Sequence, residues 1–515
     1  MTEEGRNLGD VFAHHADSDR TAIIDLYDPK NPREASFRDL IAGCDAVSNG
    51  LLIAGIQPGE RIAILALNRL EYLEVLFGAM RAGCIPVMVN IKLPADTLNY
   101  ILKDSGAKIA FVDPEFANLC DGVDGLRVVT FGNQGPDSYE DFIVAGPDGT
   151  PDGSYESYIP ERGDIAEQPY TSGSTGRPKG VLLDHAGQCW MIDQLVESRD
   201  LLPDDRSVIS APLYHKNALL AIKSALAAGG SIVLFARFDA KQYIRAIERY
   251  GLTMLTGVPT MYALVLQQQA LLAETDLSSV RTCSMGSAPA SESLLDNLAA
   301  TFPKAALNLN YGITEGGPIL FSWKHPKGLP RPRYTVGYPL DGVEIRLVNG
   351  ARENEGILHV RSPGVTSGYH NLPQESKNRL IEGWLDTSDI LSRDDDGWYY
   401  FVGRADDMFV CAGENIYPGE VETLLERHPD IMQAVVVPAP NELKAHVPYA
   451  FVVARPEGQA DEEAIKQFAL EHGPVYAHPR RVIFVDELPL SGTNKIDRNA
   501  LRDLAAEEAK SSGSA

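Results

Sequence analysis

The sequence predicts a multidomain α/β fold: two layered α/β subdomains, a small β-rich subdomain, and a small α+β domain at the C-terminus. Three observations support this prediction. The chain has 515 residues, which is too long for a single hydrophobic core. Helical and strand-like patterns alternate along residues 36–113 and again along residues 215–289. The pattern then changes to short strands and turns, and it changes once more after residue 404.

The first subdomain is predicted from apolar residues that switch repeatedly between helical and strand-like spacing. Residues 36–55 carry apolar positions at helical spacing and end in a glycine, which is a common helix stop. The strand-like runs are short and apolar, as expected for buried parallel strands covered by helices. The expected helices are 36–55, 71–84 and 96–106, and the expected strands are 61–67, 85–90 and 108–113.

The second subdomain repeats this rhythm without a close repeat of residues. A strand that ends in a turn is expected within residues 279–289. Sheets of this class bind ligands at the carboxyl ends of their strands, so the residues after each strand are candidates for a site. The other expected elements are helices at 215–230 and 239–251 and strands at 231–236 and 252–258.

The last part of the chain predicts two smaller structures. Short strands and turns between residues 343 and 402 indicate a β-rich subdomain. The segment after "GRADD" has its own helices and strands and the size of a small independent domain. We therefore expect domains at 1–404 and 405–515, with a frayed tail over 505–515. The expected C-terminal elements are helices at 418–428 and 461–473 and strands at 431–440, 449–456 and 481–489.

The charge balance excludes some classes of function. The net charge is -25, whereas nucleic acids and anionic membranes select for basic surfaces. An anionic small molecule is still allowed, because it needs only a local positive site. The acidic, polar N-terminus is not a signal peptide, and no run approaches the ~18 apolar residues of a membrane span.

The six cysteines are scattered along the chain. They form no CxxC pair, and no cysteine–histidine cluster has the spacing of a zinc site. This distribution is typical of reduced, mostly buried thiols, and it predicts a cytoplasmic protein.

A loop rich in glycine and hydroxyl groups carries the first functional signal. The stretch "YTSGSTGRPKG" covers residues 170–180 and contains one lysine, Lys179. Backbone N–H groups beside glycines can approach phosphate oxygens, and hydroxyls and a lysine add donors. The spacing is not that of a Walker A loop. By composition alone a flexible linker fits the stretch as well as a phosphate-binding loop does.

The order of residues in this loop resembles the phosphate loop of the adenylate-forming superfamily. This family includes acyl-CoA synthetases, the amino-acid-activating domains of peptide synthetases, and beetle luciferases. Each further motif, taken alone, fits an ordinary turn, strand end or surface lysine, and only their joint order supports the family. In the family's order they are "PLYH" at 212–215, "GSAP" at 286–289, "NYGITE" at 310–315, "GWLDTSD" at 383–389, "GRADDMFVCAGENIYPGEVE" from 403 and "LPLSGTNKIDR" at 488–498.

The resemblance implies a reaction in two steps. A carboxylate attacks the α-phosphorus of ATP and releases pyrophosphate, and a thiol then attacks the acyl-adenylate. ATP, Mg²⁺ and coenzyme A are the implied cofactors. Joining two anions requires positive charge at the α-phosphate and a metal on the leaving group. The resemblance further implies that residues 405–515 form a mobile domain that rotates about a hinge at Asp406 between the two steps.

The catalytic residues follow by resemblance from the motifs. Lys495 approaches the substrate carboxylate and the α-phosphate, Thr314 binds the α-phosphate, and Glu315 binds Mg²⁺. His215 lies beside the acyl carboxylate. Asp389 accepts the ribose hydroxyls. The residues that the resemblance assigns to ATP are Thr171, Ser172, Gly173, Ser174, Thr175, Gly176, Lys179, Gly286, Ser287, Ala288, Pro289, Asn310, Tyr311, Gly312, Asp389, Phe401 and Arg404.

The thiol and acyl sites are less sharply marked. The segment "VYAHPRR" replaces the family's usual basic cluster, and its side chains either contact CoA or cap the last strand. The same segment includes Arg481. The CoA candidates are Cys411, Ala412, Gly413, Glu414, Lys444, Tyr476, His478 and Arg480. The acyl-pocket candidates are Trp190, His215, Lys216, Asn217, Val258, Met285 and Gly286.

Lys216 and Asn217 stand where many relatives have apolar or small residues. A buried lysine is costly without an anionic partner, so one hypothesis is that the acid carries a second polar or acidic group that meets these side chains. The alternative is that Lys216 points into solvent, as most lysines do.

The sequence is therefore identified as that of a member of the adenylate-forming superfamily, with motifs closest to aryl- and medium-chain-acyl CoA ligases. The expected function is an AMP-forming acid:CoA ligase for an aromatic or medium-sized acid. Two alternatives are an enzyme that loads a carrier-protein pantetheine and a non-catalytic nucleotide-binding relative. The second predicts the loss of Lys495, Glu315 or Asp389, and all three are present. The oligomeric state, including a homodimer, is left open.

Overall fold

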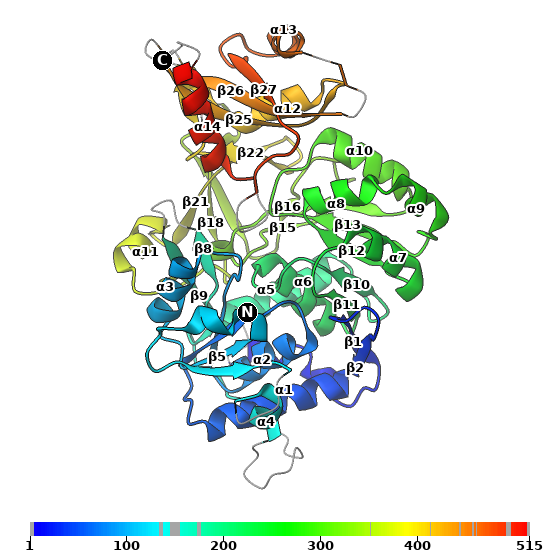
Figure 1. Cartoon of the computed structure of the whole chain (residues 1–515), viewed down its shortest axis with the longest axis vertical. Helices are drawn as coiled ribbons and strands as arrows, with labels where there is room; N and C mark the ends of the chain where they lie inside the picture. The colour runs from blue at the N-terminus through cyan, green and yellow to red at the C-terminus, as the bar shows by residue number, and fades with distance from the viewer. Residues whose placement is uncertain are drawn as a thin grey trace. The chain divides into compact units, whose positions relative to one another are not determined.

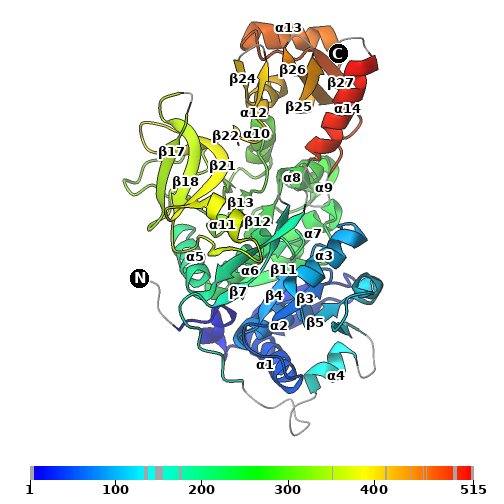
Figure 2. The same cartoon turned by 90° about the vertical axis from the view of Figure 1, so that its left-hand side faces the viewer.

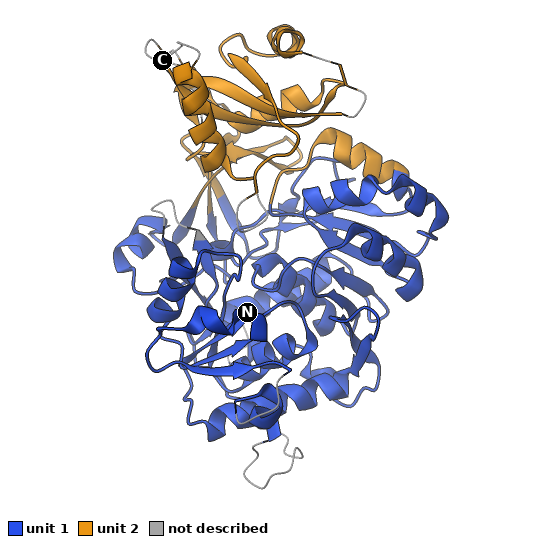
Figure 3. Cartoon of the chain, viewed as in Figure 1, with its two compact units in different colours: residues 1–287, 301–345, 360–386 blue, residues 288–300, 346–359, 387–515 orange. Residues whose placement is uncertain are grey.

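The fold was analysed in a computed structural model, shown from two sides in Figures 1 and 2. Its contacts divide the chain into two compact units (Figure 3): residues 1–287, 301–345 and 360–386 form unit 1, and residues 288–300, 346–359 and 387–515 form unit 2. This division does not follow a single cut after residue 404, and the functional domains 1–404 and 405–515 stay a prediction. The structure describes residues 5–132, 137–144, 155–172, 177–350, 352–411, 414–441, 444–455, 458–459, 461–490 and 496–511.

Unit 1 begins with a parallel sheet in the order β4-β3-β5-β6. Alternate residues of its strands point to opposite faces. Ile62 and Ile64 of β3 belong to the core shared with the first two helices, whereas Ala63 and Leu65 belong to the core under the third. The predicted helices and strands of this region are confirmed. They are β3 (Arg61–Leu65), β4 (Ile85–Met88), β5 (Ile109–Val112), α1 (Phe37–Ile53), α2 (Leu70–Arg81) and α3 (Ala95–Ser105). Strand β6 (Arg127–Thr130) was not predicted.

The second sheet of unit 1 has seven strands in the order β14-β13-β12-β10-β11-β1-β2. The strands from β14 to β1 run parallel, and β2 is antiparallel to β1. Strand β1 was not predicted, and it joins the sheet beside β11, where Ile23 pairs with Ile232. The elements are β1 (Thr21–Leu26), β2 (Arg33–Ser36), β10 (Arg206–Ile209), β11 (Ser231–Phe235), β12 (Met254–Gly257), β13 (Thr282–Met285), β14 (Ala306–Leu309), α5 (His185–Ser198), α6 (Lys216–Ala227) and α7 (Ala240–Tyr250).

A smaller sheet of unit 1 carries the strands on both sides of the glycine-rich loop. Strand β8 (Tyr170–Ser172) pairs antiparallel with β9 (Pro178–Asp184), so that Thr171 lies opposite Lys179. Strand β9 also pairs with β7 (Ile165–Glu167) and with β19 (Gly368–Tyr369). The described flanks of the loop are therefore ordered strands, which holds Thr171 and Lys179 in fixed positions.

The C-terminal part of unit 2 has the predicted α+β character. A sheet in the order β24-β23-β26-β25, with β27 beside β26, is covered by helices α12 (Pro418–Glu426), α13 (Glu462–His472) and α14 (Arg498–Ser511). Before it, β22 pairs with β21. The strands wholly in unit 2 are β22 (Tyr399–Arg404), β23 (Phe409–Cys411), β24 (Glu414–Ile416), β25 (Ile431–Asn441), β26 (Ala445–Ala454) and β27 (Arg481–Phe484). Strand β20 (Leu380–Ile381) lies in unit 1, and the residues of β17 (Glu344–Val348), β18 (Glu355–Arg361) and β21 (Trp384–Arg393) are divided between the two units.

Short elements complete the described chain. They are the 3-10 helices η1 (Leu8–Asp10), η2 (Ala13–His15), η3 (Pro114–Cys120) and η4 (Thr314–Gly316), the helices α4 (Tyr139–Val144), α8 (Pro259–Leu266), α9 (Gln269–Glu274), α10 (Glu292–Thr301) and α11 (Pro373–Arg379), and the strands β15 (Phe321–Ser322) and β16 (Tyr338–Pro339). Among the described helices, none has the length and hydropathy needed to cross a membrane.

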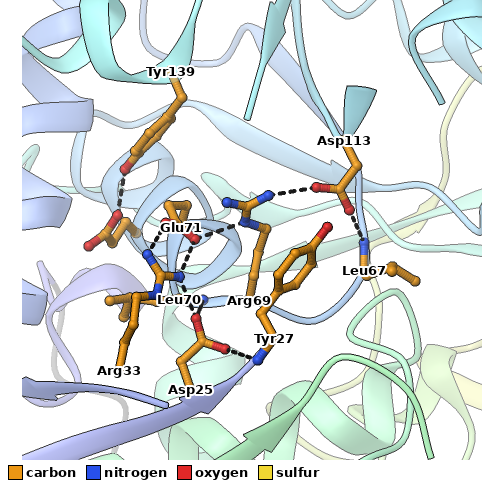
Figure 4. A network of polar contacts seen from close by, with 10 residues as sticks. Asp25, Tyr27, Arg33, Leu67, Arg69, Leu70, Glu71, Asp113 and Tyr139 are labelled. Atoms are coloured by element: carbon orange, nitrogen blue, oxygen red, sulfur yellow. Dashed lines mark hydrogen bonds and ion pairs between the residues drawn. The ribbon is translucent and has the colours of Figure 1, made fainter. Parts of the chain in front are cut away.

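A network of charged side chains joins the two large sheets of unit 1 (Figure 4). Arg69 donates to Asp113, after β5, at 2.7 Å and to Glu71 at 2.8 Å. Arg33 of β2 donates to Glu71 at 2.6 Å and to Asp25 of β1. Burial opposes the ionisation of Glu71, but the hydrogen bonds from Arg33 and Arg69 outweigh it and lower its pKa to about 2. Removing one member would leave an uncompensated buried charge.

Glu74, one turn further along α2, has a raised pKa, in contrast to the lowered pKa of Glu71. This raised pKa predicts that the stability of the protein depends on pH. Glu74 accepts a hydrogen bond of 2.6 Å from the Tyr139 hydroxyl, and burial raises its pKa to about 7. Since this folded-state pKa lies above the value of an unfolded glutamate, the stability contributed by the protonated form is lost as the pH rises from about 4.5 to 7. The effect of Glu74→Gln on the free energy of unfolding should therefore be more favourable at pH 8 than at pH 5, by about 2 kcal/mol.

Thermal unfolding of the Glu74→Gln and unmutated proteins at both pH values measures this effect. The Tm of the variant minus the Tm of the unmutated protein should be several degrees larger at pH 8 than at pH 5. Glu71→Gln is the matched control from the same helix, and it should destabilise the protein at both values because its carboxylate is ionised throughout. An unchanged difference in Tm for Glu74→Gln between pH 5 and pH 8 would contradict the assignment.

All six cysteines are buried and form no disulfide. Burial raises the pKa of Cys84, Cys189 and Cys283 to about 12. Thiolates, and not thiols, are the reactive species, so these groups are inert in the folded protein. The expectation of buried, unpaired thiols is confirmed.

Candidate functional site

Glu315 lies at the centre of a polar cluster built from three segments of unit 1. Its Oε1 accepts hydrogen bonds from the Thr171 hydroxyl at 3.3 Å and from the Tyr369 hydroxyl at 3.0 Å. The Thr366 N–H donates to the Glu315 carbonyl at 2.8 Å and fixes the backbone there. The fold thus brings together Thr171 and Glu315, which are 144 positions apart. Tyr369 belongs to none of the recognised motifs, and sequence reasoning missed it.

The oxygen atoms of this cluster fit a magnesium ion. Mg²⁺ prefers hard oxygen ligands and is commonly held by one or two carboxylates together with substrate phosphates and water. The carboxylate of Glu315 and the adjacent hydroxyl of Thr171 provide such ligands at the edge of the glycine-rich loop. Among the described residues, no group of three or more His, Cys, Asp or Glu side chains is arranged to hold a metal ion.

Lys179 lies next to this cluster. Its side chain is buried on β9 and forms an ion pair of 2.7 Å with Glu375 of α11. Its Nζ also lies 5.5 Å from the centre of the Tyr369 ring, over its face. Lys179 and Glu315 therefore share Tyr369 as a neighbour. A phosphate that approached this cation would compete with the Glu375 carboxylate.

The motifs after β13 and β14 form tight backbone turns. The Asn310 N–H donates to the Met285 carbonyl at 2.7 Å, and a Cβ on Gly286 would lie 3.1 Å from the Asn310 carbonyl oxygen. A Cβ on Gly312 would lie only 1.6 Å from the Pro318 carbonyl oxygen, so only glycine fits there. Ser287 has a φ of 68°, a conformation that non-glycine residues rarely adopt and that is common at functional sites.

Two of the side chains assigned to the nucleotide lie in the same motif. Tyr311 is buried, and its ring packs edge-on against Phe321 at 5.8 Å between centroids. Thr314 opens the short helix η4 that also carries Glu315. Stacking of Tyr311 on adenine stays a prediction.

Lys216 opens helix α6 directly after His215, whose ring packs edge-on against Tyr214 at 4.7 Å. The Lys216 side chain is 4% exposed and pairs with Oε1 of Glu167, at the end of β7. Lys223, two turns further along α6, pairs with Oε2 of the same carboxylate at 2.8 Å. The alternative that Lys216 points into solvent is therefore wrong.

The Lys216–Glu167–Lys223 triad also revises the hypothesis of a substrate group bound to Lys216, because Glu167 already supplies the anionic partner. One carboxylate cannot balance two ammonium groups. Burial, and then the charge of Lys223, lowers the pKa of Lys216 well below its usual value. Burial lowers the pKa of Lys223 to about 7. The spacing of seven residues between the lysines, which places both on one helix face, was the signal that sequence reasoning missed. Asn217 is half-buried in the next position and stays a candidate for the acyl pocket.

The remaining acyl-pocket candidates lie on different elements of unit 1. Trp190 is half-buried on α5, and a Cβ on Gly342 would lie 3.3 Å from its ring. Val258 precedes α8, and the buried Met285 ends β13. Their common role in an acyl pocket stays a prediction.

Unit 2 brings together the two residues predicted to bind ribose. Asp389 of β21 pairs in register with Arg404 of β22, and Arg404 Nε lies 3.2 Å from Asp389 Oδ1. The Asp389 side chain is 7% exposed, so its second oxygen is held in a fixed direction. Phe401 lies on the same strand as Arg404 and is half-buried. Asp406 follows in a turn, 3.9 Å from the Arg404 guanidinium. Ala288 and Pro289 belong to a separate segment of unit 2.

The CoA candidates in unit 2 fall into two places. Cys411 is buried at the end of β23, and Glu414 is exposed at the start of β24. His478 and Arg480 contact each other before β27, and burial lowers the pKa of His478. Arg481 instead pairs with Glu462 at 3.2 Å, which is the strand-capping alternative. Lys444 is half-buried and Tyr476 is exposed.

Several sequence-predicted residues lie outside the described part of the chain. The side chain of Ser172 is not described either, although its backbone belongs to β8. The sequence-predicted residues that lie outside the described part of the chain are Gly173, Ser174, Thr175, Gly176, Ala412, Gly413 and Lys495.

Two family models match this chain. The family model of the AMP-binding enzymes matches residues 12–370, and that of the AMP-binding enzyme C-terminal domain matches residues 420–495. A feruloyl-CoA synthase from Amycolatopsis sp is 31% identical over 482 residues, covering 91% of this chain and 93% of the relative. A fatty acid–acyl-carrier-protein ligase from Streptomyces coeruleorubidus is 30% identical, covering 92% of each chain.

A solved structure extends the likeness to three dimensions. The crystal structure of an anthranilate CoA ligase in complex with anthranoyl-AMP has a TM-score of 0.87 to this chain at 28% identity. The match covers 98% of both chains.

Proposed function

The chain belongs to the adenylate-forming superfamily of AMP-binding enzymes, and from this membership we propose that it is an AMP-forming acid:CoA ligase. The single observation that carries the proposal is the contact of Glu315 with Thr171, which joins the NYGITE motif to the glycine-rich loop. The Asp389–Arg404 pair supports it independently, because a buried carboxylate is a suitable acceptor for two ribose hydroxyls.

The chain's own residues have distinct tasks in the first step. Glu315 and Thr171 would hold Mg²⁺, which supplies charge neutralisation on the phosphates when bound. Asp389 orients the ribose, and Lys179 contributes positive charge near the β- and γ-phosphates. Lys495 brings positive charge to the substrate carboxylate and the α-phosphate. A carboxylate oxygen bonds to the α-phosphorus while the bond to pyrophosphate breaks.

The second step transfers the acyl group to CoA. The CoA sulfur bonds to the acyl carbon, the bond to the AMP oxygen breaks, and the thiol proton is released. We propose an aromatic or medium-sized acid. Trp190 would shorten or flatten the pocket, and the feruloyl and anthranilate relatives are named for aromatic acids.

A pyrophosphate-exchange screen tests this proposal. The full chain is incubated with ATP, Mg²⁺ and labelled pyrophosphate in the presence of a library of carboxylic acids. The best acid is then tested with CoA as acceptor. We expect exchange with a subset of acids and formation of the CoA thioester. Exchange with no acid would contradict an adenylate-forming activity.

A second candidate function is the loading of a carrier-protein pantetheine. It is favoured by the similarity to the fatty acid–acyl-carrier-protein ligase. Both acceptors present the same pantetheine thiol, so the first step cannot distinguish them. Equal concentrations of CoA and a holo-carrier protein, compared as acceptors for the same acid, decide between the two.

Lys179→Ala should have a modest effect on ATP. Because Lys179 is expected to contact the β- and γ-phosphates and not the reacting phosphorus, we expect the KM for ATP to rise about 3- to 10-fold, as for the loss of one charged contact. Steady-state kinetics with varied ATP measures it. Glu375→Gln is the matched variant, since it removes the competing carboxylate while keeping Lys179. Its KM for ATP should not rise, and an equal rise in both variants would indicate a structural role for the ion pair.

A further inference from the structure

Asn310 is held in one orientation by three hydrogen bonds. Its Oδ1 accepts from Arg199 Nη2 at 3.1 Å and from Trp323 Nε1 at 2.9 Å, and its Nδ2 donates to the Ser284 hydroxyl at 2.7 Å. The backbone of Asn310 is fixed by its bond to Met285. Asn310 and its three side-chain partners form a clamp. Asn310 itself lies at the carboxyl ends of β13 and β14, which is where parallel sheets bind ligands.

Arg199 is the charged member of this clamp. It follows helix α5, and its guanidinium lies 4.7 Å over the Trp323 ring. Its Nε is buried without a hydrogen-bond partner, and the one hydrogen bond of the guanidinium to a described residue is the contact with Asn310. Within the described chain no carboxylate lies within ion-pair distance of it. Burial, and then the charge of Arg331, lowers its pKa to about 9. An arginine nonetheless stays protonated near neutral pH, so this half-buried guanidinium is a cation without a counter-charge among the described residues.

The neighbouring Arg331 shows what a purely structural arginine looks like in this place. Its guanidinium donates to the carbonyls of Leu307, Leu309 and Thr335 at 2.9–3.1 Å and to the Asn308 side chain. These bonds tie β14 to the following segment. Arg199 makes one such bond, and its remaining donors are left for another acceptor.

The lack of a carboxylate partner separates the half-buried Arg199 from the buried lysines of unit 1. Lys216 and Lys223 have Glu167, and Lys179 has Glu375. Arg199 is adjacent to the Met285 and Gly286 backbone through Asn310, and both residues are acyl-pocket candidates. A guanidinium binds a carboxylate or phenolate oxygen in a fixed, planar geometry.

We propose that Arg199 binds a second, anionic oxygen group of the carboxylic acid, at the end remote from the carboxylate that is activated. The substrate class is thus a dicarboxylic acid or an acid with an acidic hydroxyl, and Arg199 is a specificity-determining residue. This inference rests on the proposed function. It assigns the second polar contact to Arg199 instead of Lys216, because Lys216 already pairs with Glu167 whereas no described carboxylate pairs with Arg199.

Matched acids that differ at one end test the proposal. Pyrophosphate exchange is measured with cinnamate, 4-hydroxycinnamate and 4-carboxycinnamate, and with hexanoate and hexanedioate. We expect the unmutated protein to favour the members with a second oxygen group. Arg199→Gln should lower kcat/KM for these about 10- to 100-fold, the effect of losing one hydrogen-bonded charge pair, and change the plain acids less than about 3-fold. Arg199→Lys should keep part of the preference.

Two controls keep the outcomes distinct. Lys324→Gln removes an exposed cation that binds Asp200 and the Glu197 carbonyl, and it should leave every acid unchanged. Tm values identify a variant that fails to fold, in which case Arg199→Lys carries the test. A preference for plain acids in the unmutated protein, or an equal loss for all acids in Arg199→Gln, would overturn the role of Arg199 alone. Exchange with no acid at all would overturn the proposed function as well.

Fluorescence offers a readout that is independent of turnover. Trp323 lies against the Arg199 guanidinium, so an anion bound there changes the surroundings of its indole. Titration of the unmutated protein with hexanedioate in the presence of ATP should change the tryptophan emission more than titration with hexanoate. The difference should disappear in Arg199→Gln, and its persistence there would place the anion elsewhere.

Discussion

Lys495→Ala is expected to abolish acyl-adenylate formation while leaving thioester formation from preformed acyl-adenylate mostly intact. The first step joins two anions, and the lysine assigned to the reacting atoms supplies charge that no other residue replaces. Loss of one such preorganised group commonly costs about 10²–10³-fold, and a group that also positions the carboxylate costs more. We therefore expect the rate of adenylation to fall at least about 10³-fold.

Contacts of described residues on either side of residues 491–495 hold this part of the chain, so the variant should still fold. Leu490 and Ile496, the described residues on either side of this segment, pair as an antiparallel bridge. Arg498 then binds both oxygens of Glu422 at 2.7 and 2.8 Å. These contacts do not involve the Lys495 side chain.

Two assays measure the half-reactions separately. Pyrophosphate exchange follows adenylation, and single-turnover reaction of synthetic acyl-adenylate with CoA follows thioester formation. Lys466→Ala is the matched control, because Lys466 forms surface ion pairs with Glu462 and Glu463 on α13. It should leave both rates unchanged. An equal loss of both half-reactions in Lys495→Ala would contradict the assigned role.

Glu167→Ala should produce the largest loss of stability. Glu167 is fully buried between Lys216 and Lys223, so its removal leaves both buried amino groups without their anionic partner. Breaking a buried charge pair by removing one partner costs about 3–5 kcal/mol. Because Lys216 opens α6 directly after His215, we also expect a higher KM for the acid.

Thermal unfolding and acid kinetics of Glu167→Ala measure both effects. The triple variant Glu167→Leu/Lys216→Met/Lys223→Met replaces the whole triad with apolar side chains and should recover most of the lost Tm, since no buried charge remains. Glu161→Ala removes an exposed glutamate in the segment before β7 and is the neutral control. A Tm of Glu167→Ala equal to that of the unmutated protein would show that the triad is not a stabilising element.

The sequence predicted the fold where patterns are local. The helices at 36–55 and 215–230 were found because apolar residues recur at one face and a glycine ends the run. The motifs led to Thr171, Glu315, Asp389 and Arg404, and the structure pairs Thr171 with Glu315 and Asp389 with Arg404.

The features that were missed depend on contacts between distant segments. Strand β1 could not be placed beside β11, because the pairing of Ile23 with Ile232 leaves no periodic signal in either segment. Tyr369 reaches Glu315 only once β19 has paired with β9. Lys216 was judged by its neighbours in the chain, whereas its partner Glu167 comes 49 positions earlier.

The six buried cysteines make this chain a convenient background for spectroscopy. None of them offers an accessible thiolate, so a maleimide dye or nitroxide should ignore the native protein. A cysteine introduced on an exposed surface would then be the one labelled position, without prior removal of native thiols. Probes placed in this way on either side of Asp406 would report directly on whether the segment bends during turnover.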